Sequence, residues 1–361
     1  MDCRKFFNQR PIMENKMNKK YTVASDGSGD FLTVQEALQV QDDSLTLFVK
    51  NGIYKGPVFS TKKELHIIGE DEKKTIFTGS TGAKNIFSDG SKTGTFRTYT
   101  AYFSGEKATL ENLTIENTAG QGTVAGQAIA LYASASYMYC KNVRLLGYQD
   151  TLFTAPLPEK EHIKGGFTGP EEKLPRRPSV QCYENCFISG TIDFIFGSAD
   201  ALFTNCTIAL HDTETECYIA APSTPPDRTG YIFNHCTVVQ AEPFSPEKNE
   251  RIFLGRPWRE YAKCCWMNSS FSNIICSESW DNWGNVQNEK TSDFSVYKNT
   301  WKHAGIAGKG TFARNLTDSE ALSMLKKAEK IYCSAAASCS REASKNAPIP
   351  LSSSEITGSS I

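Results

Sequence analysis

Short apolar segments separated by polar turns dominate the chain from residue 21 onward. Residues 21–24 and 45–49 are rich in β-branched and aliphatic side chains, so each predicts a strand. Between them, Thr33 and Glu36 have the spacing of a capping box and predict a short helix that ends near Val40. The N-terminal part of the chain is therefore expected to be mainly β, with one small helix.

A repeated unit follows in the middle of the chain. Five segments each carry polar or amide residues, then a residue suited to burial, then one further residue and an aliphatic residue. The five positions expected to point inward are Leu113, Val143, Cys186, Cys206 and Cys236. Their separations of 30, 43, 20 and 30 residues favour a solenoid with loop insertions. We therefore predict a parallel β-helix; the alternative is five ordinary strands of a β-sandwich.

The rest of the chain suggests how this domain is bounded. Residues 154–179 are rich in Pro, Gly and charge, account for the 43-residue step and are expected to form a surface insertion. Residues 1–20 and 341–361 are expected to be a disordered lead and a disordered Ser-rich tail, leaving 21–340 as a single domain. A C-terminal helix is predicted to start at 317–320, with an apolar face formed by Leu322, Leu325, Ala328 and Ile331.

Composition narrows the class of protein. The net charge of −1 gives no overall field towards nucleic acid or a membrane, and no apolar run approaches the length of about 18 residues that a membrane span requires. The 12 cysteines form no paired framework and the five histidines are scattered singly, so we expect free thiols, no metal and no cofactor. Without an apolar signal segment in the first twenty residues, the sequence as given predicts a cytoplasmic protein; a different N-terminus would permit secretion. We expect a monomer.

Two aspartates stand at the same phase of consecutive repeats. Asp150 lies seven residues after Val143, and Asp193 lies seven residues after Cys186; each is preceded by Gly and followed by Phe at matching spacing. Adjacent coils of a parallel β-helix stack about 4.8 Å apart, so the two carboxylates are predicted to lie side by side. Because close like charges repel, this pairing favours a site in which one carboxylate is ionised and the other holds a proton. A solvated pair without function is the alternative.

Other side chains near this pair suit ester chemistry. Gln149 precedes Asp150, and Gln127 lies one coil earlier; their neutral NH₂ groups can stabilise a transient oxyanion, although each alone is more typical of a surface residue. Arg256 can hold a carboxylate ionised or bind a substrate carboxylate, and Trp258 can stack on a sugar ring. Each of these signals is weak when taken alone.

Together, these segments resemble the pectin methylesterase (pectinesterase) family of carbohydrate esterases. Three stretches look like its signature motifs and a fourth is similar to another: residues 147–153, 190–197, 254–258 and 127–131. The opening at 26–37 also resembles the start of that family, and Ala220-Ala221-Pro222-Ser223-Thr224 is similar to a segment of its bacterial branch. The resemblance spans about residues 21–305 and keeps the family's order of motifs.

The resemblance implies a fold and a set of roles. The fold would be a right-handed, single-stranded parallel β-helix that uses no metal, acting on methyl-esterified homogalacturonan or its oligomers. Asp193 would be the nucleophile and Asp150 the general acid and later base, with Gln149 and Gln127 at the oxyanion and Arg256 orienting Asp193. The implied substrate contacts are Trp258, Thr100, Tyr132, Phe153 and Phe196.

Two stretches depart from the family pattern. The segment after Tyr54 lacks a usual Glu, and residues 276–280 lack the usual Pro and Gly before Trp280, so one groove wall is expected to differ. Three other functions stay open on the sequence: a β-helix glycoside hydrolase or lyase acting on pectic chains, a non-catalytic carbohydrate-binding solenoid, and an esterase for another acyl substrate.

Overall fold

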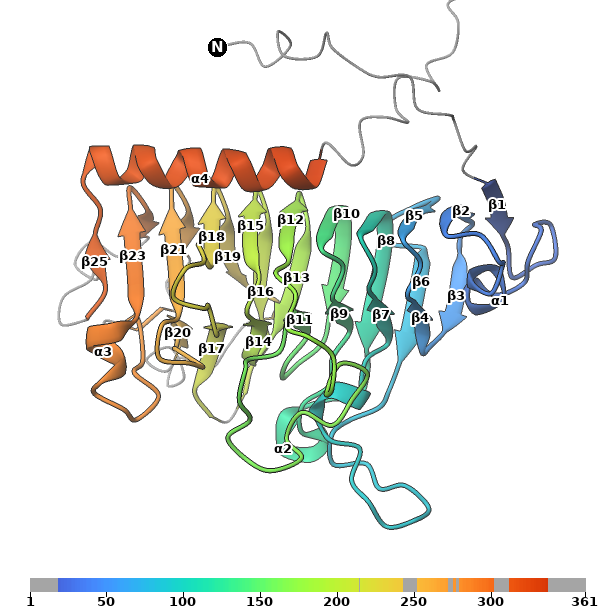
Figure 1. The fold of residues 1–361 in the computed structure, drawn as a ribbon, viewed down its shortest axis with the longest axis horizontal. Helices are drawn as coiled ribbons and strands as arrows, with labels where there is room; N and C mark the ends of the chain where they lie inside the picture. The colour runs from blue at the N-terminus through green and yellow to red at the C-terminus, as the bar shows by residue number, and fades with distance from the viewer. Residues whose placement is uncertain are drawn as a thin grey trace, which may run out of the picture.

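A computed structural model describes residues 19–213, 215–242, 252–271, 275–276, 279–301 and 312–336. Their strands form two sheets, and every pairing between named strands in this part of the chain is parallel. The successive coils stack along one axis (Figure 1). The predicted parallel β-helix is confirmed, and the β-sandwich alternative is wrong.

The larger sheet has eighteen strands among the described residues. They are β1 (Lys19–Val23), β2 (Ser44–Val49), β3 (Gly52–Lys55), β5 (Glu64–Gly69), β6 (Thr75–Gly79), β8 (Lys107–Asn117), β10 (Tyr137–Leu146), β12 (Val180–Glu184), β13 (Phe187–Gly190), β15 (Asp200–Thr204), β16 (Thr207–Leu210), β18 (Tyr231–Asn234), β19 (Thr237–Gln240), β21 (Lys263–Met267), β22 (Ser270–Phe271), β23 (Asp293–Tyr297), β24 (Thr300–Trp301) and β25 (Arg314–Asn315). The smaller sheet contains β4 (Val58–Ser60), β7 (Ala101–Phe103), β9 (Leu131–Ala133), β11 (Leu152–Thr154), β14 (Ile192–Gly197), β17 (Cys217–Pro222) and β20 (Ile252–Gly255).

The repeat has a simple physical origin. In the β8–β10 pair Leu113 lies opposite Val143, and all five predicted inward positions are buried. The residue before each of them has a positive φ between 52° and 55°, a left-handed bend that turns the chain from one strand to the next. Asn tolerates this conformation better than most residues, which explains the amide in four of the five units; His235 occupies the fifth.

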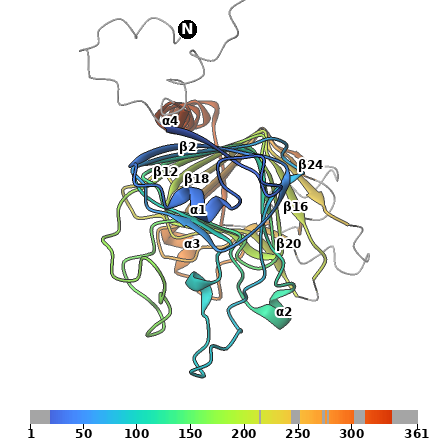
Figure 2. The same ribbon diagram turned by 90° about the vertical axis from the view of Figure 1, so that its right-hand side faces the viewer.

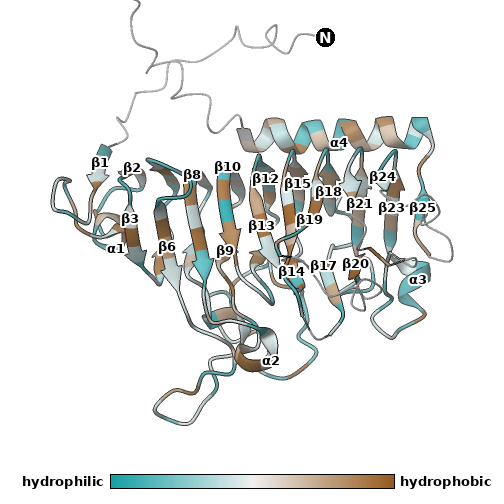
Figure 3. Cartoon of the chain, turned by 180° about the vertical axis from the view of Figure 1, so that it is seen from behind, coloured by the Kyte–Doolittle hydropathy of each residue, from teal (hydrophilic) through white to brown (hydrophobic). Residues whose placement is uncertain are grey.

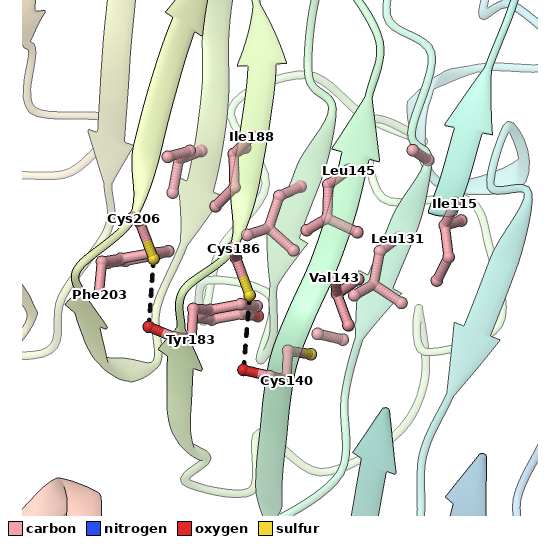
Figure 4. Packing of buried hydrophobic residues seen from close by; sticks show 14 of the residues in the cluster. Ile115, Leu131, Cys140, Val143, Leu145, Tyr183, Cys186, Ile188, Phe203 and Cys206 are labelled. Atoms are coloured by element: carbon pink, nitrogen blue, oxygen red, sulfur yellow. Dashed lines mark hydrogen bonds between the residues drawn. The ribbon is translucent and has the colours of Figure 1, made fainter. Parts of the chain in front are cut away.

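The buried cysteines form a second ladder inside the coil. The thiol of Cys186 donates to the Cys140 carbonyl oxygen at 3.4 Å, and the thiol of Cys206 donates to the Tyr183 carbonyl oxygen at 3.2 Å (Figure 4). Cys236 repeats the pattern on Phe203. Cys186, Cys206, Cys217, Cys236, Cys264 and Cys265 are free, buried thiols, so the free-thiol prediction is confirmed for these six.

Two helices pack against the solenoid, the first near its N-terminal end and the second along its side (Figure 1). α1 (Val34–Leu38) begins with the predicted Thr33–Glu36 capping box and ends two residues before the predicted end. α4 (Asp318–Ala336) begins with a reciprocal pair of hydrogen bonds between Thr317 and Glu320 and covers the outer face of β10, β12, β15, β18 and β21.

The predicted apolar face of α4 is wrong at one position. Leu322 is 55% exposed, and Ala321 is buried in its place, while Ala328 and Ile331 are buried as predicted. Apolar and polar residues alternate along this helix (Figure 3). Strand β1 begins at Lys19, inside the predicted lead; the remainder of that lead, 1–18, and the tail at 341–361 lie outside the described residues.

The longest loops project from the side opposite α4, where both views place them (Figures 1 and 2). They include the short 3₁₀ turn at Thr95–Arg97, α2 (Gly122–Ala125) and the insertion after β11, while α3 (Asn288–Thr291) lies near the C-terminal end. None of the helices among the described residues is long and apolar enough to cross a membrane.

Candidate active site

Asp150 and Asp193 are brought together by the register of the smaller sheet. In the β11–β14 pair Phe153 lies opposite Phe196, and each Phe follows its aspartate by three residues. The Asp150 backbone N–H donates to the Ile192 carbonyl oxygen at 3.1 Å, directly beside Asp193. Both aspartates have a positive φ, of 64° and 50°, and each is 7% exposed. The pairing predicted from the repeat phase is therefore present.

The two carboxylates have different partners. Arg256 Nε donates to Asp193 Oδ1 at 2.8 Å, and Arg256 Nη2 donates to Oδ2 at 2.7 Å. Burial raises the pKa of Asp193, and Arg256 opposes that rise. Burial also raises the pKa of Asp150, well above its ordinary range, and the neighbouring Asp193 adds to the rise. The ion pair with Arg256 thus favours the anion of Asp193 over that of Asp150.

Arg256 is itself fixed by two aromatic rings that the sequence did not reveal. Its guanidinium carbon lies 3.7 Å from the ring centroid of Tyr218 and 3.8 Å from that of Trp283. Such stacking holds the planar fork in the orientation that a bidentate carboxylate contact requires. Tyr218 lies opposite Ile192, the residue before Asp193, in the β14–β17 pair, whereas Trp283 lies between Trp280 and α3, outside the named strands.

The two predicted glutamines lie on neighbouring coils beside the pair. The backbone N–H of Ala128, the residue after Gln127, donates to the Gln149 carbonyl oxygen at 3.0 Å. Both side chains are partly exposed, and within the described part of the chain neither amide NH₂ has a hydrogen-bond acceptor. The structure thus places the two amides on the coil of Asp150 and on the coil before it, and their role at an oxyanion stays a prediction.

The aromatic residues predicted to contact sugar form a packed cluster instead of an open platform. Tyr132 and Phe153 are 0% exposed and Phe196 is 3% exposed, and the ring of Phe96 packs on all three. Trp258 alone of the predicted sugar-binding aromatics is partly exposed, with its ring centroid 5.7 Å from that of Phe196.

Thr100 is also buried beside this region. Its hydroxyl donates to the Glu116 carbonyl oxygen at 2.8 Å. Thr100, Tyr132 and Phe153 are all buried, which gives them a supporting position behind the surface of the site. A direct substrate contact for any of the three stays a prediction.

The insertion at 154–179 folds against this aromatic cluster. The Phe167 ring lies 5.8 Å from that of Phe96 and 6.3 Å from that of Trp258. Glu171 is buried and accepts hydrogen bonds from Tyr102 and Ser134, and burial raises its pKa. Surface exposure was predicted for this segment, but Leu157, Phe167 and Glu171 are buried. The insertion is consequently part of the site's wall.

No group of three or more His, Cys, Asp and Glu side chains among the described residues is arranged to hold a metal ion. The polar groups on these coils are two buried carboxyl groups, a guanidinium and two amides. This set can attack a carbonyl, stabilise the oxyanion and deliver a proton.

Comparison with known proteins agrees with this geometry. A family model described as Pectinesterase matches residues 20–157 and 166–323. The chain belongs to the pectinesterase family. Its match to that model is interrupted only at 158–165, inside the insertion.

Individual pectinesterases show the same relationship. The chain is 32% identical over 309 residues to "Probable pectinesterase/pectinesterase inhibitor 21" of Arabidopsis thaliana, covering 82% of this chain but 42% of that protein. The chain thus spans about two fifths of this plant relative. Among solved structures, a pectin methylesterase from carrot is 27% identical, with a TM-score of 0.72 over 94% of this chain and 99% of that one. A pectin methylesterase in complex with a hexasaccharide is 25% identical, with a TM-score of 0.65 over 85% and 95%. The resemblance to the bacterial branch stays a prediction.

Proposed function

We propose that this pectinesterase hydrolyses the C6 methyl esters of galacturonate units in pectin or oligogalacturonides and releases methanol. The observation that carries the proposal is the bidentate pairing of Arg256 with Asp193 beside the buried Asp150. It gives one carboxylate the charge of a nucleophile and the other the proton of a general acid. The solved hexasaccharide complex of a structural relative supports a pectic oligomer as the ligand class.

The proposed first step forms an acyl-enzyme. A carboxylate oxygen of Asp193 attacks the ester carbonyl carbon, and the carbonyl electrons move onto oxygen, where the NH₂ groups of Gln127 and Gln149 donate. The tetrahedral intermediate collapses with cleavage of the bond to the methoxy oxygen, which takes the proton of Asp150 and leaves as methanol. The substrate is now joined to Asp193 as an anhydride.

The second step regenerates the site. Asp150, now ionised, accepts a proton from water as the water oxygen attacks the acyl carbonyl carbon. Cleavage of the anhydride returns Asp193 as a carboxylate and releases a galacturonate carboxylic acid, which ionises in solvent. Asp150 is again protonated, so no metal or cofactor enters the balance.

The reaction class is tested by following two products from one substrate. Incubation with methyl-esterified hexagalacturonate should release methanol without new reducing ends. New reducing ends or unsaturated ends without methanol would instead show the glycoside hydrolase or lyase alternative, which also employs paired carboxylates. The absence of both products, together with measurable binding, would favour a binding solenoid.

Two finer points belong to the same proposal. We expect the enzyme to act as a monomer without nucleic acid or membrane partners, which sedimentation of the purified chain with and without oligogalacturonide would test. The predicted cytoplasmic location would be tested by assaying methylesterase in separated cell fractions.

A further inference from the structure

The side chain of Gln149 lies against the short helix α2 (Gly122–Ala125). A Cβ atom at Gly122, the first residue of this helix, would be 2.3 Å from Gln149 Oε1, 3.1 Å from Gln149 Cβ and 3.2 Å from Gln149 Cδ. Non-bonded heavy atoms pack at about 3.5–4.0 Å, so the first of these distances is a clash. The Gln149 amide therefore occupies space that is open only because residue 122 has no side chain.

This need for glycine is steric and not conformational. Gly120 and Gly126, on either side of α2, have a positive φ, but Gly122 does not. An alanine could therefore adopt the backbone of residue 122, and the three atoms nearest to its methyl group would all belong to Gln149. A substitution here acts first on that one side chain.

The end of the Gln149 side chain can move, whereas its backbone is fixed. The Ala128 backbone N–H donates to the Gln149 carbonyl oxygen at 3.0 Å, and the N–H of the next residue, Asp150, donates to the Ile192 carbonyl oxygen at 3.1 Å. The Gln149 side chain itself is partly exposed. A methyl group at residue 122 is therefore expected to turn the amide away at little cost in stability, with the backbone beside Asp150 left in place.

The helix α2 is held by contacts on two sides. Lys84 Nζ donates to the Thr123 carbonyl oxygen at 2.6 Å, and Gln121 Nε2 donates to the Asp212 carbonyl oxygen at 2.8 Å. A helix of 4 residues is too short to hold a position through its own hydrogen bonds. Its place against Gln149 is consequently fixed by these connections to two other segments of the chain.

We propose that α2 positions the Gln149 amide for the oxyanion, and that this depends on the missing side chain at Gly122. The proposal rests on the function proposed above, in which Gln149 donates to the carbonyl oxygen of the reacting ester. Such a donor acts at about 2.7–3.1 Å from the oxyanion, and a displacement of about 1 Å can cost on the order of 10²-fold in rate. Gly122 touches no reacting atom in this mechanism, so it is a positioning residue.

The experiment is a double-mutant cycle on methanol release from methyl-esterified hexagalacturonate. It compares the wild type, Gly122→Ala, Gln149→Ala and the variant with both substitutions. Gly122→Ala should reduce kcat about 10- to 100-fold and leave KM within about twofold, because the oxyanion forms only after the ester is bound. The double variant should match Gln149→Ala within about twofold, since the amide that Gly122 positions is already absent.

A matched control is Thr123→Ala. Thr123 is the next residue of α2, its side chain is exposed, and the substitution keeps the carbonyl oxygen that accepts from Lys84. This variant should keep the wild-type kcat. Thermal melting should place Tm of Gly122→Ala within about 2 °C of the wild type, which separates a displaced amide from a damaged fold.

Two kinetic results would overturn the proposal. An unchanged kcat in Gly122→Ala would show that the amide needs no space at residue 122, and an equal loss in the Gln149→Ala background would show that Gly122 acts through another group. If the wild type releases no methanol, the pectinesterase function fails instead. Crystal structures of the wild type and Gly122→Ala then decide the positioning claim separately: a displaced Gln149 amide supports it, and an amide in the same place refutes it.

Discussion

Replacing Arg256 by Met tests how the nucleophile is kept ionised. In the wild type, two charge-assisted hydrogen bonds of 2.8 and 2.7 Å connect Arg256 to Asp193, which is 7% exposed. Removing one partner of a buried ion pair typically costs about 3–5 kcal/mol, because the remaining charge is left without compensation. Asp193 would avoid that cost by binding a proton, so its pKa, already raised by burial, would rise further.

The consequence should appear in the pH profile of kcat/KM. The acidic limb reports ionisation of Asp193, and the alkaline limb reports loss of the proton from Asp150. For Arg256→Met we expect a loss of about 10²- to 10³-fold near neutral pH, corresponding to roughly 3–4 kcal/mol, and an acidic limb displaced to higher pH. Arg256→Lys should be displaced less, because it keeps the charge but loses the bidentate geometry.

The assay is methanol release across pH 4–9 in buffers of constant ionic strength, with thermal melting at each pH. A uniform loss without displacement of the acidic limb would refute this explanation. Arg256 would then act on the substrate or transition state and not on the ionisation of Asp193.

Three further predictions follow from burial and hydrogen bonding. Asp150→Asn should abolish methanol release yet raise Tm at pH 7 by on the order of 1–2 °C. The raised pKa of Asp150 makes wild-type stability fall as pH increases from the ordinary Asp range towards that raised pKa, whereas Asn does not titrate. An unchanged or lower Tm in calorimetry would contradict this. Gln127→Ala and Gln149→Ala should each reduce kcat about 10²- to 10³-fold with little change in KM, and a loss confined to KM would show that the amides bind the ground state. Ile331→Ala, in the buried face of α4, should lower the free energy of unfolding by about 2–5 kcal/mol, while Leu322→Ala at an exposed position should change it by about 0.5 kcal/mol or less. Equal losses in urea titrations would show that α4 packs differently.

The aspartate pair could be predicted from the sequence because a parallel coil converts repeat phase directly into spatial neighbours. Val143 lies opposite Leu113 in the structure, and the same phase carries Asp150 to Asp193. The residue before each inward position has a positive φ, which Asn tolerates better than most residues. This backbone geometry explains why Asn recurs at that place in the repeat.

Features outside that repeat could not be predicted in the same way. Trp283 reaches Arg256 from a segment outside the named strands, and Phe167 reaches Phe96 from an insertion without periodicity. Tyr218 lies opposite Ile192 on the next coil, but its stacking on Arg256 depends on side-chain directions that the repeat does not give. On α4, Leu322 and Ala321 are neighbours in the sequence, and the rotation of the helix that decides which is buried depends on packing against β10 and β12.

The assignment of Asp193 as the nucleophile is tested most directly by methanol release from methyl-esterified hexagalacturonate by the wild type and Asp193→Ala. We predict that the wild type releases methanol and that Asp193→Ala releases none while it remains folded, as judged by circular dichroism. Near-wild-type methanol release by a folded Asp193→Ala enzyme would contradict the account.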